Sequence, residues 1–368
     1  MSLQRRLSRQ ELVTHKNRKD ITNDLSSLSF ENALTAEERQ YLPLRARYHA
    51  FAVTSCAHAA YIVAVLNEMR QVLSEIKNPI NKKTIKFLNQ TPPRNPLRVG
   101  FIGCGRLGKQ IVSCLLTFSD IRPEEIIIST RRPSTLTSFR KAGIRCIFDN
   151  REVVASSNIL FLCCLPANLS TVSDEIAGFI STDCLIFSYV TGICLPRLKQ
   201  MLQHNNVAKM EFTWSMKNAN KTWDIGDDVT SALEKEWIAE LTCSLSPTTK
   251  TNGIVWTSPK LFETAIYAAL NMCPSLGVTT KEAINLINIV FLAKNETDKG
   301  RLTWKHFLDN ESLAYVDLGN LPVFDMFHIG TQDTPFTDVL QCSDEVLRLM
   351  LTKKYLSTFN RFRNSKDS

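Results

Sequence analysis

Mostly apolar runs alternate with helical repeats along the middle of the chain. The runs are short, which is typical of strands that are covered on both faces of a sheet. They span residues 97–102, 125–129, 144–148, 158–165 and 184–190. Helical apolar spacing fills the intervals, over residues 107–118, 133–142, 153–156 and 168–179. This alternation predicts βαβ units and a parallel sheet whose strands all end at one edge.

A longer helical pattern precedes the sheet. Apolar and small residues recur from Leu44 to Lys77, which predicts one long amphipathic helix packed on the rest of the protein. Its most apolar stretch, residues 50–66, contains polar residues and falls short of the roughly 20 strongly apolar residues of a span, so we expect no integral membrane segment. His58 has no second histidine or cysteine at ligand spacing, which favours a packed histidine over a metal ligand.

Helical periodicity returns after residue 258 and continues to the C-terminal region. The whole pattern predicts an α/β protein: a Rossmann-type doubly wound parallel sheet, an all-α C-terminal domain and a helical N-terminal extension. We place the extension at residues 1–96, with a basic tail, the long helix and a Pro-rich connector at 91–96. The sheet domain then covers residues 97–252, and the helical domain covers 253–368.

Composition narrows the class of protein. The chain has 368 residues, of which 44% are hydrophobic and 22% charged, which excludes a mostly disordered chain and a multispan membrane protein. The net charge of +8 favours contact with anions, whether a phosphate cofactor, nucleic acid or a membrane surface. Without a basic stripe interleaved with aromatic residues, we expect no nucleic-acid partner.

The 11 cysteines bear on compartment and metal binding. They are odd in number and contain no Cys-x-x-Cys pair, which predicts buried, reduced thiols in an intracellular protein without a disulfide framework or metal site. Residues 1–19 are rich in arginine and lysine, and a mitochondrial presequence is one interpretation. Glu11 and Asp20 favour a basic tail instead. We therefore expect a cytoplasmic protein, with the mitochondrion as the alternative.

A Gly-x-Gly-x-x-Gly motif joins the first predicted strand to the first helix of the sheet. It reads Gly103-Cys104-Gly105-Arg106-Leu107-Gly108. Gly103 permits a tight turn, Gly105 lets the backbone approach a pyrophosphate, and Gly108 lets the helix pack closely on the strand. The N–H groups and dipole of the helix N-terminus would hold the phosphate. The alternative is a glycine-rich turn that binds no ligand.

The end of the second predicted strand discriminates between cofactors. An NAD site usually has a carboxylate here that binds the ribose 2′-hydroxyl. This chain has Ser129-Thr130-Arg131-Arg132 instead. The two arginines can form bidentate bonds to a 2′-phosphate, and the two hydroxyls add donors. The segment therefore predicts NADP as the cofactor, and the alternative is a solvated basic turn.

The run Val99–Gly108 resembles the opening of the pyrroline-5-carboxylate reductases. The segment 161–166 is similar to that family's fourth strand and Lys-Pro turn, with Leu165 in place of the lysine and Pro166 retained. The segments 188–193 and 258–283 continue the resemblance, which covers about residues 97–293. It implies that Leu165 and Pro166 contribute to an NADPH-binding domain. It also implies a helical domain that forms a homodimer, with a small-molecule substrate between the two domains.

The resemblance weakens in the substrate half. The family's arginine corresponds to Lys209, its Met-Pro-Asn stretch aligns with Glu211–Thr213, and its Pro-Gly-Gly-Thr-Thr segment has no counterpart. These differences imply an altered substrate site. Lys209, Ser258 and Lys260 are the polar residues nearest the expected cleft, but surface or helix-capping roles suit them better. We therefore assign no catalytic residue.

Two functions follow from these features. The first is an NADPH-dependent oxidoreductase that transfers hydride to an imine or carbonyl of a small metabolite, similar to pyrroline-5-carboxylate reductase but with an altered substrate site. The second is a catalytically inactive NADP-binding scaffold or sensor. Cofactor binding is common to both, so only turnover separates them.

Overall fold

A computed structural model describes residues 30–77, 95–214, 223, 226–294, 300–342 and 345–360. The basic tail expected at residues 1–19 and most of the Pro-rich connector lie outside the described residues.

A six-stranded parallel sheet forms the centre of the molecule, with the strand order β3-β2-β1-β4-β5-β6. The strands are β1 (Val99–Ile102), β2 (Ile126–Ser129), β3 (Arg145–Ile147), β4 (Ile159–Leu162), β5 (Leu185–Ser188) and β6 (Val207–Ala208). The predicted doubly wound sheet is thus confirmed. The two-residue β6 was not predicted, because so short a strand leaves no periodic pattern.

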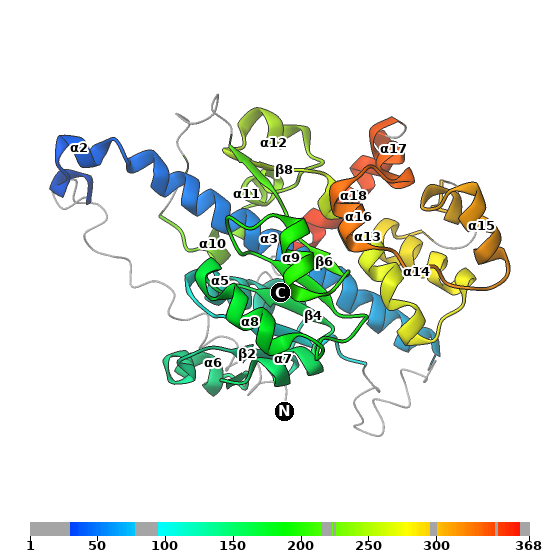
Figure 1. Ribbon diagram of the computed structural model, residues 1–368. Helices are drawn as coiled ribbons and strands as arrows, with labels where there is room; N and C mark the ends of the chain where they lie inside the picture. Colours follow the sequence, from blue (N-terminus) through cyan, green and yellow to red (C-terminus); the bar gives the residue numbers. More distant parts are fainter. Residues whose placement is uncertain are drawn as a thin grey trace, which may run out of the picture.

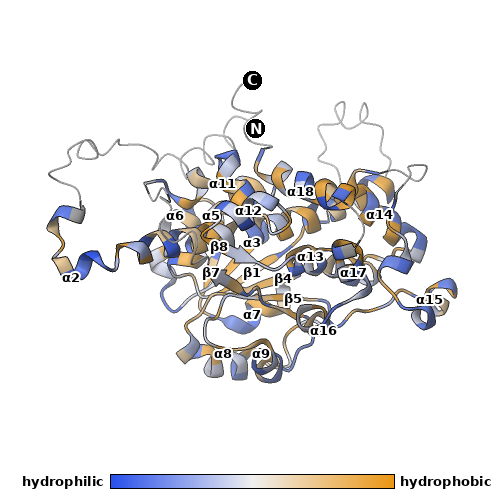
Figure 2. Ribbon diagram, turned by 90° about the horizontal axis from the view of Figure 1, so that it is seen from above, coloured by the Kyte–Doolittle hydropathy of each residue, from blue (hydrophilic) through white to orange (hydrophobic). Residues whose placement is uncertain are grey.

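Helices cover both faces of this sheet. Alternating strand residues point to opposite faces, so Phe101 and Phe161 join one buried cluster while Ile102 and Leu160 join another. Figure 2 shows α7, α8 and α9 on one side of the strands and α3, α5 and α6 on the other. Their bounds are α5 (Arg106–Phe118), α6 (Thr137–Lys141), α7 (Asn150–Ser156), α8 (Leu169–Ile176) and α9 (Leu195–Leu202).

The long predicted helix is α3 (Leu42–Lys77), which runs through the molecule and continues past its body toward α2 (Ala36–Arg39) (Figure 1). Every residue from 52 to 67 is buried, so this stretch is enclosed on all sides rather than amphipathic. It packs against α5 on the sheet side and against C-terminal helices elsewhere. By length and composition α3 could cross a membrane, but its apolar stretch is mostly buried inside the protein.

His58 lies in this enclosed part of α3. Its Nε2 atom is 3.0 Å from the carbonyl oxygen of Thr242, and its ring stacks on Phe212 with the centroids 6.2 Å apart. Burial lowers the pKa of His58 from its ordinary value to about 4. His58 is therefore a neutral, packed histidine, as the spacing predicted.

Most of the remaining elements are helices. Those of the C-terminal region are α13 (Lys260–Met272), α14 (Thr280–Leu292), α15 (Asn310–Asp317), α16 (Met326–Thr331), α17 (Pro335–Cys342) and α18 (Glu345–Asn360). Shorter helices precede them: α10 (Val229–Leu233), α11 (Glu236–Leu241) and α12 (Pro247–Asn252). Helical N-terminal and C-terminal regions are thus confirmed around the sheet.

A small antiparallel sheet was not predicted. It pairs β7 (Phe212–Trp214) with β8 (Val255–Thr257), and β8 contacts α3. The two strands are far apart in sequence, so no local turn signal indicates their pairing. Part of the chain that we expected to open the helical domain is therefore a strand.

Candidate nucleotide-binding edge

The predicted site residues lie along one edge of the sheet because its strands are parallel. Ile102, the last residue of β1, is paired in register with the last residues of β2 and β4. The glycine turn follows β1, residues 129–132 end and follow β2, and Leu165 with Pro166 follows β4. In open α/β sheets this carboxyl edge is where ligands bind.

Two glycines of the turn are required by the fold itself. Gly103 has φ +85°, and its N–H donates to the carbonyl oxygen of Ser129 at 2.9 Å. A Cβ atom on Gly103 would lie 2.9 Å from the backbone of Cys163, and one on Gly108 would lie 3.0 Å from the Gly103 oxygen. Side chains at either position would therefore disturb the junction of β1, β4 and α5.

Gly105 differs from these two glycines. Its φ of −77° suits any residue, and a Cβ atom there would meet no atom of the described residues within 4 Å. Gly105 precedes α5, whose first turn no side chain in the described part of the chain caps. The protein thus leaves open space beside uncapped N–H groups at a helix N-terminus, an arrangement that suits a phosphate group.

The turn's cysteine packs inward. Cys104 is buried, and this burial raises the pKa of its thiol to about 12. The neighbouring Cys163 is also held neutral, because burial raises its pKa well above the usual range. Cys104 can therefore offer a ligand its backbone N–H, but not a thiolate.

The side chains at the end of β2 point in two directions, some into the protein and some outward. The Ser129 side chain is buried, and its hydroxyl lies 3.2 Å from the carbonyl oxygen of Phe148 and also bonds the Asn150 side chain. We expected this hydroxyl to face a 2′-phosphate, but the structure directs it into the protein. Thr130 is half-buried, and its N–H donates to the Ile147 oxygen at 3.0 Å.

Arg131 and Arg132 point outward. Both are exposed, and neither makes a side-chain hydrogen bond or ion pair with any residue that the structure describes. At the carboxyl end of β2, two guanidinium groups therefore have no partner in the part of the chain that the structure describes. On the other side of the glycine turn, Leu165 is 64% exposed, and Pro166 opens the short 3-10 helix Pro166–Asn168.

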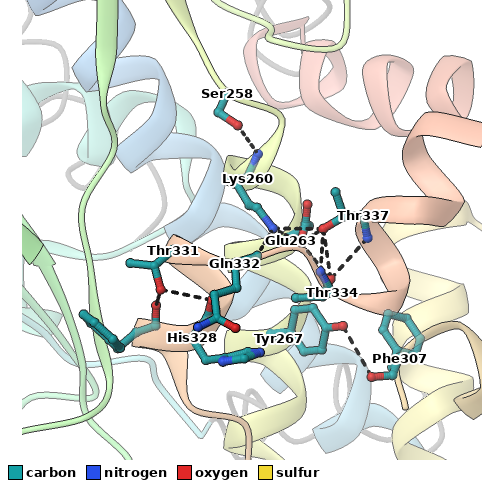
Figure 3. A network of polar contacts seen from close by, with 11 residues as sticks. Ser258, Lys260, Glu263, Tyr267, Phe307, His328, Thr331, Gln332, Thr334 and Thr337 are labelled. Carbon is teal, nitrogen blue, oxygen red and sulfur yellow. Dashed lines mark hydrogen bonds and ion pairs between the residues drawn. The ribbon is translucent and has the colours of Figure 1, made fainter. Parts of the chain in front are cut away.

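The residues near the expected substrate cleft are engaged within the protein. The Lys260 ammonium bonds Glu263 Oε2 at 2.8 Å, the Gln332 oxygen at 2.6 Å and Thr337 Oγ1 at 2.9 Å (Figure 3). Three acceptors match its three protons. Glu263 is 1% exposed and also accepts the Thr334 hydroxyl at 2.9 Å. This buried ion pair joins α13 to the start of α17.

Lys209 and Ser258 have structural contacts of the same kind. The Ser258 hydroxyl accepts the N–H of Lys260 at 3.3 Å, so it caps the first turn of α13, as its sequence position suggested. The Lys209 ammonium donates to the carbonyl oxygen of Ile193, and partial burial lowers the pKa of Lys209. The Lys260 ammonium therefore has all three of its protons in hydrogen bonds, whereas the Ser258 hydroxyl accepts one hydrogen bond and keeps its own proton.

Two residues of the α13 ion-pair cluster and the sheet edge, Glu263 and Phe148, were not predicted from the sequence. Glu263 looked like an ordinary helix residue, because its partners at 334 and 337 lie about one fifth of the chain away. Phe148 looked like the last residue of a buried strand, whereas β3 ends at Ile147 and the Phe148 side chain is 71% exposed. An aromatic residue just before Asp149, which caps α7, was the available signal.

The strand order and the glycine turn between β1 and α5 define a Rossmann-type dinucleotide-binding domain. Residues 98–188 match the family described as NADP oxidoreductase, coenzyme F420-dependent. The chain is 34% identical to NADP-dependent oxidoreductase domain-containing protein 1 of Mus musculus, over 86% of this chain and 88% of that protein. It therefore belongs to the family of that protein.

The predicted likeness to pyrroline-5-carboxylate reductases is also confirmed. The Escherichia coli pyrroline-5-carboxylate reductase is 29% identical over 128 residues, which are 34% of this chain and 48% of that protein. A solved pyrroline-5-carboxylate reductase from Coxiella burnetii has 17% identity and a TM-score of 0.29, covering 73% of this chain and 98% of that one. A Plasmodium falciparum pyrroline carboxylate reductase solved with NADP bound has 11% identity and a TM-score of 0.28, covering 73% and 97% of the two chains.

Proposed function

We propose that the protein is an NADPH-dependent oxidoreductase that transfers hydride to an imine or carbonyl group of a small metabolite. The observation that carries this proposal is the open space at Gly105 beside the uncapped first turn of α5. Arg131 and Arg132, which have no side-chain partner among the described residues, stand at the end of the adjacent strand β2. No side chain of the described residues binds these groups, and together they suit a dinucleotide with an additional phosphate.

Each part of the edge has a role in this proposal. The backbone N–H groups of residues 105–108 hold the pyrophosphate, and Arg131 and Arg132 select the 2′-phosphate over the 2′-hydroxyl of NADH. Ser129, Thr130, Leu165 and Pro166 shape the edge on either side. NADPH supplies the hydride when bound. The protein's own contribution is to hold the nicotinamide against the acceptor carbon and to exclude water.

The wider organisation follows the same proposal. We assign the extension to residues 1–96, the NADPH-binding domain to 97–252 and the substrate and dimerisation domain to 253–368. The ten cysteines whose side chains the structure describes are free thiols, which suits a reducing intracellular compartment, and we propose the cytoplasm. We propose that the substrate differs from pyrroline-5-carboxylate, because Lys209 stands in place of the family's arginine and the family's Pro-Gly-Gly-Thr-Thr segment has no counterpart in this chain.

Calorimetric titration with NADPH and NADH tests the cofactor site. We expect NADPH to bind more tightly, and the double substitution Arg131→Ala/Arg132→Ala to remove the preference because it removes both phosphate-binding groups. The matched control is Arg140→Ala/Lys141→Ala, which removes the same charge from exposed positions at the far end of α6. If neither cofactor binds at millimolar concentration, the proposal is wrong.

One observation favours the second candidate, a binding protein without turnover. The Lys260 ammonium, one of the polar groups nearest the expected cleft, has all three of its protons bonded to protein acceptors and so is not available as a proton donor. NADPH oxidation should therefore be followed with a panel of cyclic imines, aldehydes and ketones. Oxidation of NADPH by any of these supports the enzyme, whereas tight binding without oxidation supports a scaffold or sensor.

A further inference from the structure

We propose that Phe148 is the surface on which the adenine base of the cofactor stacks, an inference that rests on the proposed NADPH site. Phe148 follows β3 directly, and 71% of its surface is exposed. A large exposed aromatic ring at the ligand-binding edge of a Rossmann-type sheet has no packing role there. Its flat apolar face is the kind of surface that binds a purine.

The backbone on both sides of Phe148 is fixed, so the ring is held at this edge. On one side, the N–H of Thr130 donates to the Ile147 oxygen at 3.0 Å, and the Ser129 hydroxyl lies 3.2 Å from the Phe148 oxygen. On the other side, Asp149 caps α7 by accepting N–H groups of its first turn. These bonds join the end of β3 to the end of β2, where Arg131 begins the exposed arginine pair.

The order of groups along the edge matches the order of groups in the cofactor. The sheet order places the ends of β3, β2 and β1 side by side. They carry, respectively, the Phe148 ring, the arginine pair and the glycine turn. Base, 2′-phosphate and pyrophosphate follow one another in the adenine half of NADPH. Neighbouring strands are about 4.8 Å apart, so the three ends span about 10 Å, a suitable length for this half of the molecule.

The experiment compares ligands with and without the nicotinamide half. Adenosine 2′,5′-bisphosphate and NADPH are titrated into the full-length protein and into Phe148→Ala and Phe148→Tyr. We expect Phe148→Ala to raise Kd about ten-fold for both ligands, because each has the base. Phe148→Tyr keeps the aromatic face and should bind like wild type. Thermal unfolding should be unchanged in both variants, because the side chain is exposed.

Tyr48→Ala is the matched control. Tyr48 is 50% exposed and lies in α3 before the enclosed stretch that begins at residue 52, so both affinities should stay unchanged. If wild type binds both ligands and Phe148→Ala binds them equally well, the stacking role is wrong and the proposed function stands. If wild type binds neither ligand, the cofactor site itself is wrong. A loss of affinity in Phe148→Tyr as large as that in Phe148→Ala would also contradict stacking.

Discussion

Two regions of this molecule differ in whether their polar groups have hydrogen-bond or ion-pair partners within the protein. Along the ends of β1 and β2, the first turn of α5 is uncapped and Arg131 and Arg132 have no partner among the described residues. Around the start of α13, the Lys260 ammonium and the Glu263 carboxylate are enclosed by protein partners. Both regions contain cationic side chains. A binding edge therefore differs from a structural junction in whether these side chains already have protein partners, not in their chemical type.

The largest expected effect is at the junction. Glu263→Ala leaves the Lys260 ammonium without its counter-ion in a largely buried position, because that side chain is 16% exposed. Removing one member of a buried pair typically costs about 4 kcal/mol of unfolding free energy. Urea denaturation should show a loss of that order.

The control for this prediction is Glu152→Gln, which removes the partner of Arg145 in an ion pair whose two side chains are exposed. We expect a loss below about 1 kcal/mol there, because solvent screens exposed pairs. Equal losses in the two variants would contradict the contrast between a buried and an exposed pair. NADPH affinity should be unchanged in Glu263→Ala, provided that the variant is folded.

The next largest expected effect is the dependence of stability on pH, which His58 causes. The unfolded chain protonates His58 below about pH 6.5, whereas the folded protein keeps it neutral down to about pH 4. Protons therefore bind preferentially to the unfolded state in this window, and stability falls as the pH falls from 6.5 to 4. At the acid end of this range, the lowered pKa of His58 corresponds to a loss of about 3 kcal/mol of unfolding free energy.

Denaturant unfolding of His58→Gln across this range checks the prediction. The variant should show a flatter dependence of stability on pH than wild type, whatever its stability at pH 7. His328→Gln, at an exposed position on α16, should retain the wild-type slope. An unchanged slope in His58→Gln would mean that His58 is not the group responsible.

The smallest expected effect is a difference in stability between alanine substitutions at two glycines of the nucleotide edge, Gly103 and Gly105. Gly103→Ala places a side chain at φ +85° and against the Cys163 backbone, which should cost about 2 kcal/mol of stability. Gly105→Ala should leave stability within about 0.5 kcal/mol of wild type, because its Cβ meets no described atom.

NADPH titration completes this pair of variants. Gly105→Ala should bind NADPH at least about ten-fold more weakly, because the added methyl group occupies the space proposed for the pyrophosphate. Unchanged affinity in Gly105→Ala would show that this space is not where the cofactor lies. Affinity lost in both variants in proportion to stability would indicate a general disturbance of the turn.

The sequence predicted the parts of the fold that local pattern determines. The strands β1 to β5 each lie in a mostly apolar run, and the glycine motif specifies its own turn through the positive φ of Gly103. The pairing of β7 with β8 was not predictable, because nothing local links residues 212–214 to 255–257. The full enclosure of α3 was missed for the same reason, since α18 covers it from the other end of the chain.

The candidate site shows the same division. The positions of Arg131 and Arg132 follow from the register of β2, and so the sequence placed them at the correct edge. The orientation of the Ser129 hydroxyl depends on Asn150, and the engagement of Lys260 depends on Gln332 and Thr337. Such side-chain pairings arise from tertiary contacts, which a periodic pattern does not encode.

The passage of α3 through the core has a consequence for the order in which the protein can be completed during synthesis. α3 leaves the ribosome early, yet the Tyr61 ring packs on Tyr355 of α18, with the centroids 5.0 Å apart. The apolar surface of α3 therefore remains incompletely covered until α18, which follows it by more than 250 residues, has been synthesised. During the interval between the synthesis of α3 and that of α18, the helix exposes a large apolar surface. The nascent chain would therefore depend on chaperones that shield such surfaces.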